Sequence, residues 1–313
     1  MRLDQDPRAS RGRATLTADS MNERYPSPRA LLEKYGLRAK KSWGQNFLGD
    51  DHILADIARL AAPRPGELVV ELGAGLGHLT ARLVARGARV IAVERDRDMA
   101  AVLRGELGER MDLLEADAVK LDYGTILARH STATATPTSK LAVVGNLPYH
   151  LTSPILFSLL DQAERVSRAV FLVQREVAER LVASPGTKEW GILSVLLQRE
   201  ADVSIERIVP PGAFLPPPKV ESAVLCALFR PPSEAVADLV RFRRLVKAGF
   251  AQRRKTLGNA LRAARLVEPE RLAAALAHAG IDPGRRGETL TVAEWAALDR
   301  ALDAAELSRA PTR

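Results

Sequence analysis

The sequence predicts an α/β fold, a doubly wound and Rossmann-like sheet followed by a small helical domain. Short apolar runs rich in β-branched residues alternate with helical patterns through residues 28–230, and this alternation indicates parallel strands joined by crossover helices. A glycine-rich turn directly follows one of these runs, as in nucleotide-binding sheets. From about residue 231 the chain is rich in Ala, Leu and Arg with a helical pattern, so we expect a second domain over 231–313.

The composition limits the class of protein. The 313 residues are 46% hydrophobic, which suits one large domain and a smaller one. A net charge of +8 favours a polyanionic partner. The single cysteine, Cys226, excludes an internal disulfide framework and a cysteine-rich metal site, and we expect no bound metal. The sequence has neither an apolar run long enough to cross a bilayer nor the apolar core of a secretory signal. We therefore expect a cytoplasmic protein with no membrane partner.

The N-terminal region divides into a polar tail and a basic cluster. Residues 1–27 are polar and irregular, and we expect a disordered tail or a start of translation at Met21. A basic cluster precedes the aromatic and amide residues of 43–47, and its members are Arg38, Lys40 and Lys41. Basic side chains beside aromatic rings favour contact with nucleic acid. The alternative is a solvated charge run followed by two core anchors.

The remaining elements follow in order along the chain. Strands are predicted over the apolar runs 67–72, 88–94, 111–115, 141–144 and 166–173. Helices are predicted over 28–35, 51–60, 81–87, 99–107, 151–160, 174–183 and 190–199. Two later strands, 202–208 and 222–229, flank the proline-rich loop 210–219 and predict a hairpin-like edge. The basic amphipathic stretch 241–261 opens the helical domain.

The glycine-rich turn departs from a dinucleotide-binding site. Its glycines are Gly73, Gly75 and Gly77, which is a GxGxG pattern and not GxGxxG. Glu71 stands two residues before the first glycine, where a carboxylate would repel a pyrophosphate but suits a ligand with an ammonium group. Glycines let the backbone approach such a ligand closely. The turn therefore favours a cofactor with an amino acid tail.

Two further acids follow the next strands. Glu94 ends the second predicted strand and can accept hydrogen bonds from both hydroxyls of a ribose. Asp117 follows the third and can accept from the amino group of an adenine. Three acids at three successive strand ends are poorly explained as a solvated face in a basic protein. Together they predict S-adenosylmethionine, which carries an ammonium, a sulfonium, a ribose diol and an adenine.

The tetrapeptide Asn146-Leu147-Pro148-Tyr149 follows the strand 141–144, at the sheet edge where ligands bind. Pro148 stiffens this turn, although the tetrapeptide alone is equally typical of a plain loop. Beside a methyl donor, the Asn146 side chain or the Leu147 or Pro148 carbonyl can hold the N–H groups of a base amine. Tyr149, and Phe214 from the proline-rich loop, can stack on the base.

These motifs, in this order, resemble the KsgA/RsmA family of rRNA adenine dimethyltransferases. The likeness spans about residues 35–265 and is carried by 45–48 (QNFL), 71–75 (ELGAG), Glu94, Asp117, 146–149 (NLPY), 214–224 (FLPPPKVESAV) and 253–257 (RRKTL). It implies a class I methyltransferase sheet with a helical C-terminal domain. It also implies dimethylation of N6 of two adjacent adenosines in a loop near the 3′ end of 16S rRNA, within a small-subunit precursor.

The resemblance also implies roles for particular residues. The cofactor contacts fall on Asn46, Leu48, Gly73, Glu94, Asp117 and Asn146, to which the chemistry above adds Glu71 and Gly75. The substrate contacts fall on Asn146, Leu147, Pro148, Tyr149 and Phe214. For RNA binding we predict the basic cluster named above, together with Arg253, Arg254 and Lys255. Nothing in the sequence demands a dimer, so we expect a monomer.

Two rival functions stay open. The Erm group modifies an adenine of 23S rRNA, confers antibiotic resistance and shares the QNFL and GxG features, but its tetrapeptide is usually NIPY. A mainly non-catalytic ribosome assembly factor would use the same basic surface. A dehydrogenase is disfavoured because the third glycine is at residue 77 and the five histidines form no acid–base constellation.

Overall fold

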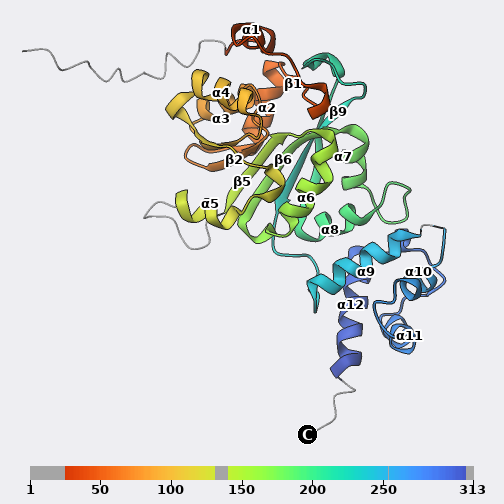
Figure 1. Ribbon diagram of the computed structural model, residues 1–313. Coiled ribbons are helices and arrows are strands. Elements are labelled where there is room, and N and C mark those ends of the chain that lie inside the picture. Colours follow the sequence, from red (N-terminus) through yellow and green to blue (C-terminus); the bar gives the residue numbers. More distant parts are fainter. Residues whose placement is uncertain (1–24, 131–139, 253, 308–313) are drawn as a thin grey trace, which may run out of the picture.

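The protein is described from a computed structural model, which covers residues 25–130, 140–252 and 254–307. Its centre is a seven-stranded sheet in the order β4-β3-β2-β5-β6-β9-β7 (Figure 1). The strands are β2 (Leu68–Leu72), β3 (Arg89–Val93), β4 (Asp112–Leu114), β5 (Leu141–Asn146), β6 (Val166–Gln174), β7 (Ala201–Val209) and β9 (Ser222–Phe229). The predicted α/β sheet is thus confirmed.

The sheet is mixed and not wholly parallel. Each neighbouring pair from β4 through β6 is parallel. Strand β9 is antiparallel to both of its neighbours, β6 and β7. The sequence predicts β7 and β9 as a hairpin-like edge, and they do pair, but β9 lies inside and β7 forms the edge. The central strands are buried on both sides, so each is a continuous apolar run in the sequence. Such a run does not indicate strand direction, and the sequence therefore does not predict that β9 is antiparallel.

Helices cover both faces of the sheet. Because side chains alternate along each strand, every strand contributes to an apolar cluster on each face. One face packs on α2 (Asp51–Ala61), α3 (His78–Ala85) and α4 (Arg97–Glu106). The other packs on α5 (Tyr123–His130), α6 (Thr152–Leu160), α7 (Arg175–Val182) and α8 (Ile192–Glu200). All but α5 are predicted from the sequence to within a few residues, as is α1 (Pro28–Lys34).

The C-terminal helices are α9 (Leu239–Ala251), α10 (Leu257–Ala264), α11 (Pro269–His278) and α12 (Val292–Leu307), the blue group below the sheet in Figure 1. The predicted basic stretch 241–261 is divided between α9 and α10. A single apolar cluster runs from the sheet into these helices. The buried Trp190 indole donates to the Leu290 carbonyl (3.0 Å) across the predicted boundary. The two predicted units therefore share one core.

The prediction of a disordered tail over residues 1–27 does not hold for residues 25–27, which lie against the folded chain. Its first 24 residues, and nearly all of the predicted linker 130–140, lie outside the described part of the chain. Within the described ranges, every helix is too short or too polar to span a membrane. No cluster of three or more potential metal ligands occurs among those residues either.

Candidate active site

Two adjoining cavities open at the carboxyl ends of the parallel strands. The first has a volume of about 110 Å³ and the second about 350 Å³, in the range of small-molecule sites when taken together. Trp43, Gly73, Glu94 and Pro148 line both cavities. The predicted residues Asn46, Leu48, Glu71, Gly75, Asn146, Leu147 and Tyr149 line the first cavity. Asp117 lines the second. The fold thus brings together residues that are more than 100 positions apart, such as Asn46 and Tyr149, which are separated by 103 positions.

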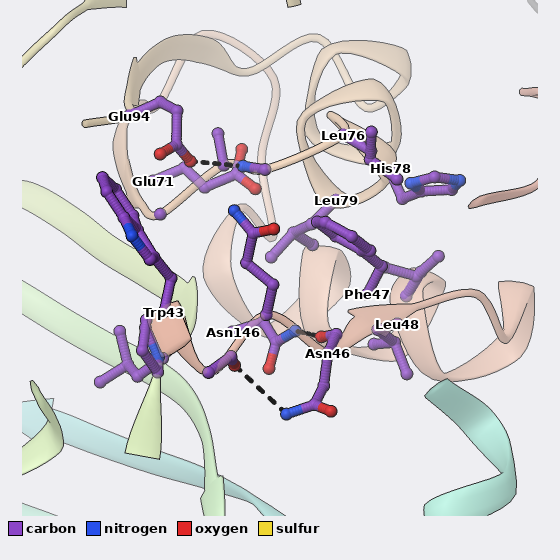
Figure 2. Close-up of a pocket in the computed structure, with 18 of the residues that line it drawn as sticks. Trp43, Asn46, Phe47, Leu48, Glu71, Leu76, His78, Leu79, Glu94 and Asn146 are labelled. Atoms are coloured by element: carbon purple, nitrogen blue, oxygen red, sulfur yellow. Dashed lines mark hydrogen bonds between the residues drawn. The ribbon is translucent and has the colours of Figure 1, made fainter. Parts of the chain in front are cut away.

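The glycine turn between β2 and α3 fixes the orientation of Glu94. Gly73, Gly75 and Gly77 adopt φ of 70°, 56° and 84°, a left-handed conformation that side chains disfavour. The Gly75 N–H donates to Glu94 Oε2 (2.8 Å) and the Asp96 N–H to Oε1 (2.7 Å), and Figure 2 shows the first of these bonds. Burial raises the pKa of Glu94, while these backbone bonds act to lower it. Both carboxylate oxygens are therefore held in place before any ligand binds.

Glu71 is the most deeply buried acid of the cavity, with 2% of its surface exposed. Burial raises its pKa from the ordinary value near 4.5 to about 8, against a lowering effect from the Thr80 hydroxyl. That hydroxyl donates to Glu71 Oε2 (2.6 Å). Glu71 is thus largely protonated at neutral pH in the protein alone, and a ligand ammonium group would favour its ionised form.

Asp117 stands at the start of the short 3-10 helix η4 (Ala118–Lys120), after β4. Its Oδ1 accepts from the Val119 N–H (3.0 Å), and Oδ2 lies 3.7 Å from the Arg95 guanidinium. The side chain is about one-third exposed. A carboxylate fixed in this way at the rim of the larger cavity can accept a hydrogen bond from a heterocyclic amine.

Asn146 is oriented by a residue 100 positions earlier. Its Nδ2 donates to the Asn46 backbone carbonyl (2.8 Å), and the Asn46 Nδ2 donates to the Gly44 carbonyl (3.2 Å), both drawn in Figure 2. Because a carbonyl can only accept, this contact assigns the amino group of the Asn146 amide. The Asn146 Oδ1 therefore points away from that carbonyl and can accept from a ligand.

The rest of the tetrapeptide is anchored on the sheet. The buried Leu147 donates its N–H to the Leu172 carbonyl (3.2 Å). The Pro148 carbonyl already accepts a hydrogen bond from the Leu151 N–H (2.8 Å), so it stabilises the turn itself. The half-buried Tyr149 has its hydroxyl 2.8 Å from Ser222 Oγ, at the start of β9. The turn thus presents its amide and its ring from a rigid base.

Phe214 differs from the other predicted substrate contacts. It belongs to the short strand β8 (Phe214–Leu215), which pairs with β1 (Phe47–Leu48) and sets Phe214 opposite Leu48. Only 5% of its surface is exposed, and it does not line either cavity. The ring is therefore buried in the protein alone, and stacking on a base would require it to become exposed.

The predicted RNA-binding residues divide into two kinds. Lys40 is a structural residue, since its Nζ lies 2.7 Å from both Asp96 and Asp98. Arg38, Arg254 and Lys255 are exposed on the surface. The side chain of Lys41 and the whole of Arg253 lie outside what the structure describes.

Trp43 is a site residue that the sequence reasoning did not assign. It lines both cavities, and 41% of its surface is exposed. Lys40 Nζ and the Arg95 guanidinium lie 5.4 Å and 5.7 Å from the ring centroid, within the range of cation–π contacts. The adjacent basic cluster was the available signal, but an aromatic in such a run is equally typical of a core anchor.

The fold and the site together define the class of protein. The parallel strands, the glycine turn after β2 and the acid after β3 are those of a class I methyltransferase, whose methyl donor is S-adenosylmethionine. A family model described as ribosomal RNA adenine dimethylase matches residues 36–303. The chain belongs to this family, and it is an rRNA adenine dimethyltransferase.

Two proteins that are similar in sequence carry the same name. Ribosomal RNA small subunit methyltransferase A of Anaeromyxobacter dehalogenans (strain 2CP-C) is 75% identical over 283 residues, which cover 90% of this chain and 100% of that protein. The protein of the same name from Myxococcus xanthus (strain DK1622) is 50% identical over 278 residues, 88% of this chain and 95% of that one.

Two solved structures share the fold. The 23S rRNA methyltransferase ErmE aligns with a TM-score of 0.61 at 29% identity, over 82% of this chain and 100% of that one. A dimethyladenosine transferase from Plasmodium falciparum aligns with a TM-score of 0.67 at 23% identity, over 83% and 98%. The second likeness supports the architecture alone.

Proposed function

We propose that this protein dimethylates N6 of two adjacent adenosines in a 3′-terminal loop of small-subunit rRNA, with S-adenosylmethionine as methyl donor. The substrate assignment is supported by a relative named for the small subunit that is 75% identical over its whole length. The observation that carries the chemistry is the orientation of the Asn146 amide by the Asn46 carbonyl. It leaves an acceptor oxygen in the wall of a cavity that is also lined by Glu94 and Gly73.

The chain's residues suit a reaction controlled by position. The lone pair of an adenine amine is delocalised into the ring, so the nitrogen attacks well only after it has been turned out of conjugation. In this proposal Asn146 Oδ1 accepts from the amine and favours that geometry. Tyr149, braced by Ser222, stacks on the base. Orientation and preorganised dipoles then supply the rate enhancement. The amine attacks through its own lone pair without prior deprotonation, and the cationic amine that results loses its proton to water.

The cofactor fits the donor and acceptor groups of the cavities. When bound, S-adenosylmethionine supplies an electrophilic methyl group on its sulfonium. In this proposal Glu94 receives the two ribose hydroxyls, for which its carboxylate is already oriented. Glu71 and the glycine turn receive the amino acid tail, and Asp117 receives the adenine amine. Asn46 and Leu48 complete the wall of the first cavity.

The larger partner is, in our proposal, a small-subunit precursor that contains 16S rRNA, met by a monomeric enzyme in the cytoplasm. The exposed Arg38, Arg254 and Lys255 would contact phosphates, together with Lys41 and Arg253. We further propose that residues 231–313 act as a helical domain that contributes to this RNA surface. In the same proposal, Phe214 becomes exposed when the RNA binds and then contacts the substrate.

An Erm-type activity on 23S rRNA is the second candidate, because the likeness to ErmE covers 82% of this chain. At 29% identity that likeness is far weaker than the one to the small-subunit enzymes. The intact acids and the oriented Asn146 argue against a role limited to assembly. An assembly role alongside catalysis is compatible with the same surface.

Mapping of the product tests the proposal. The protein is incubated with labelled cofactor and either undermethylated small subunits or protein-free large-subunit RNA, and modified adenosines are located by primer extension. We expect two adjacent dimethyladenosines in the small-subunit RNA and none in the other. A single modified adenine in the large-subunit RNA would instead establish the Erm-type activity. Binding to small subunits with no methyl transfer would identify an assembly factor.

A further inference from the structure

Residues Tyr25 and Pro26 precede the part of the chain that the family model matches, which begins at residue 36. They nevertheless lie on the glycine turn of the cofactor site. The Tyr25 hydroxyl donates to the Leu76 carbonyl (2.8 Å), within the turn itself. The His78 imidazole, on the first residue of α3, has its Nε2 2.9 Å from the Pro26 carbonyl. The two residues thus bind both the turn and the helix that follows it.

The chemistry of these contacts makes them specific. The Pro26 carbonyl can only accept, so His78 Nε2 carries the proton. Burial lowers the His78 pKa to about 4, so the ring is neutral at pH 7. The Tyr25 and His78 rings meet edge to face, with centroids 5.1 Å apart and planes at 85°. A Cβ on Gly77 would stand 2.8 Å from the Tyr25 hydroxyl oxygen, so Tyr25 also packs tightly on the backbone.

The turn needs to be held from outside. Three of its five residues are glycines with positive φ, and glycine loses more conformational entropy on ordering than other residues. Gly77 caps α3 without any side-chain hydrogen bond. The contacts that hold the turn against other segments include Glu94 at the Gly75 N–H and Tyr25 at the Leu76 carbonyl. The second of these fixes the buried Leu76, which lines the first cavity.

We propose that Tyr25 is a positioning residue for the cofactor, because its bond to the Leu76 carbonyl holds the glycine turn in its binding conformation. This inference rests on the cofactor site proposed above. The catalytic groups of the tetrapeptide lie elsewhere, on β5 and the turn after it. Loss of the bond therefore weakens cofactor binding and leaves the rate at saturating cofactor nearly unchanged.

The test compares Tyr25→Phe with a matched control in the full-length protein. Tyr35→Phe also removes one tyrosine hydroxyl, which donates to Glu106 Oε1 (2.7 Å) on α4 and does not contact the turn. Calorimetry with S-adenosylmethionine should give a dissociation constant three- to tenfold higher for Tyr25→Phe, the effect of losing about one hydrogen bond. It should stay within twofold of wild type for Tyr35→Phe. At saturating cofactor, kcat should differ by less than twofold for both.

Hydrogen exchange without cofactor provides a second measurement. The amides of Gly75 to His78 should exchange faster in Tyr25→Phe than in wild type, and at the wild-type rate in Tyr35→Phe. Equal cofactor affinity in wild type and Tyr25→Phe would overturn the inference while leaving the proposed function intact. An unchanged exchange rate in Tyr25→Phe would also overturn it. A wild-type protein that binds no cofactor would overturn the proposed site and this inference together.

Discussion

The side chain of Asn146 shows how one residue acquires a role through a distant contact. Its amide is oriented by the backbone of Asn46, and Asn46 follows the loop that carries Trp43. Sequence reasoning identified both asparagines as site residues, since each stands in a motif. It did not link them, because a hydrogen bond across 100 positions depends on the fold and has no local signal. The sequence misses the buried state of Phe214 for the same reason, and it misses Trp43 because an aromatic residue beside a basic cluster is equally typical of a core anchor.

Glu71 gives a prediction for the protein without cofactor. Because its native pKa lies above that of the unfolded chain, the native state keeps a proton that the unfolded state releases between about pH 4.5 and 8. Stability therefore falls as the pH rises through this interval. Glu71→Gln removes the titration, and its stability relative to wild type should rise by roughly 2–4 kcal/mol from pH 5 to pH 8.

Denaturant unfolding at the two pH values measures this difference. The exposed Glu109→Gln serves as the control; it keeps the Glu71 carboxyl, so its stability should fall with pH as that of wild type does. A constant offset between Glu71→Gln and wild type at both pH values would contradict the raised pKa of Glu71. Cofactor affinity should fall in Glu71→Gln, since the variant offers no charge to an ammonium group.

At the scale of elements, the sequence predicts nearly every strand and helix of the sheet domain. Helix α5 escaped because Gly124, Thr125 and the aromatic Tyr123 are poor helix formers. It forms because Asp122 Oδ1 accepts from the N–H groups of Gly124 and Thr125 and the inner face is buried. The pairing of β1 with β8 escaped because two-residue strands carry no periodic signal.

The end of strand β5 allows a test of how tightly the tetrapeptide is set against the sheet. A Cβ on Gly145 would lie 2.5 Å from the Leu72 carbonyl oxygen, which is backbone and cannot give way easily. We expect Gly145→Ala to lower the free energy of unfolding by about 1–3 kcal/mol. Gly212→Ala is the matched control, since its Cβ would meet nothing within 4 Å.

Urea denaturation measures both variants, and Gly212→Ala should stay within about 0.5 kcal/mol of wild type. Methyl transfer by Gly145→Ala should also fall, because the displaced strand end carries Asn146. Equal stability of the two alanine variants would show that β5 can move away from β2 without cost.

At the scale of the whole molecule, composition predicted two units, and the structure joins them through one apolar cluster. Composition records where the residue types change, whereas a shared core depends on which faces meet. Charge likewise predicted a polyanionic partner but not which cations are available to it. Lys40 is held by two aspartates, so its charge is already balanced within the fold.

That difference predicts unequal effects on RNA binding. Arg254→Ala and Lys255→Ala should each reduce the slope of log affinity against log salt by about 1, because each removes one phosphate contact. Lys40→Met should leave the slope unchanged. Filter binding to undermethylated small subunits between 50 and 200 mM salt, about the range in which such slopes are resolved, measures all three. A slope that falls only in Lys40→Met would show instead that RNA binds at the mouth of the site.

The proposed mechanism depends most on Asn146 as the group that holds the reacting amine. The direct measurement is the single-turnover rate of methyl transfer to undermethylated small subunits at saturating cofactor, for wild type and Asn146→Ala. Asn259→Ala, an exposed residue of α10, is the control and should match wild type. We predict a loss of about 10²–10³-fold for Asn146→Ala, the scale of removing one preorganised polar group, with cofactor affinity within a few fold of wild type. A near wild-type rate in Asn146→Ala would show that Asn146 does not hold the reacting amine.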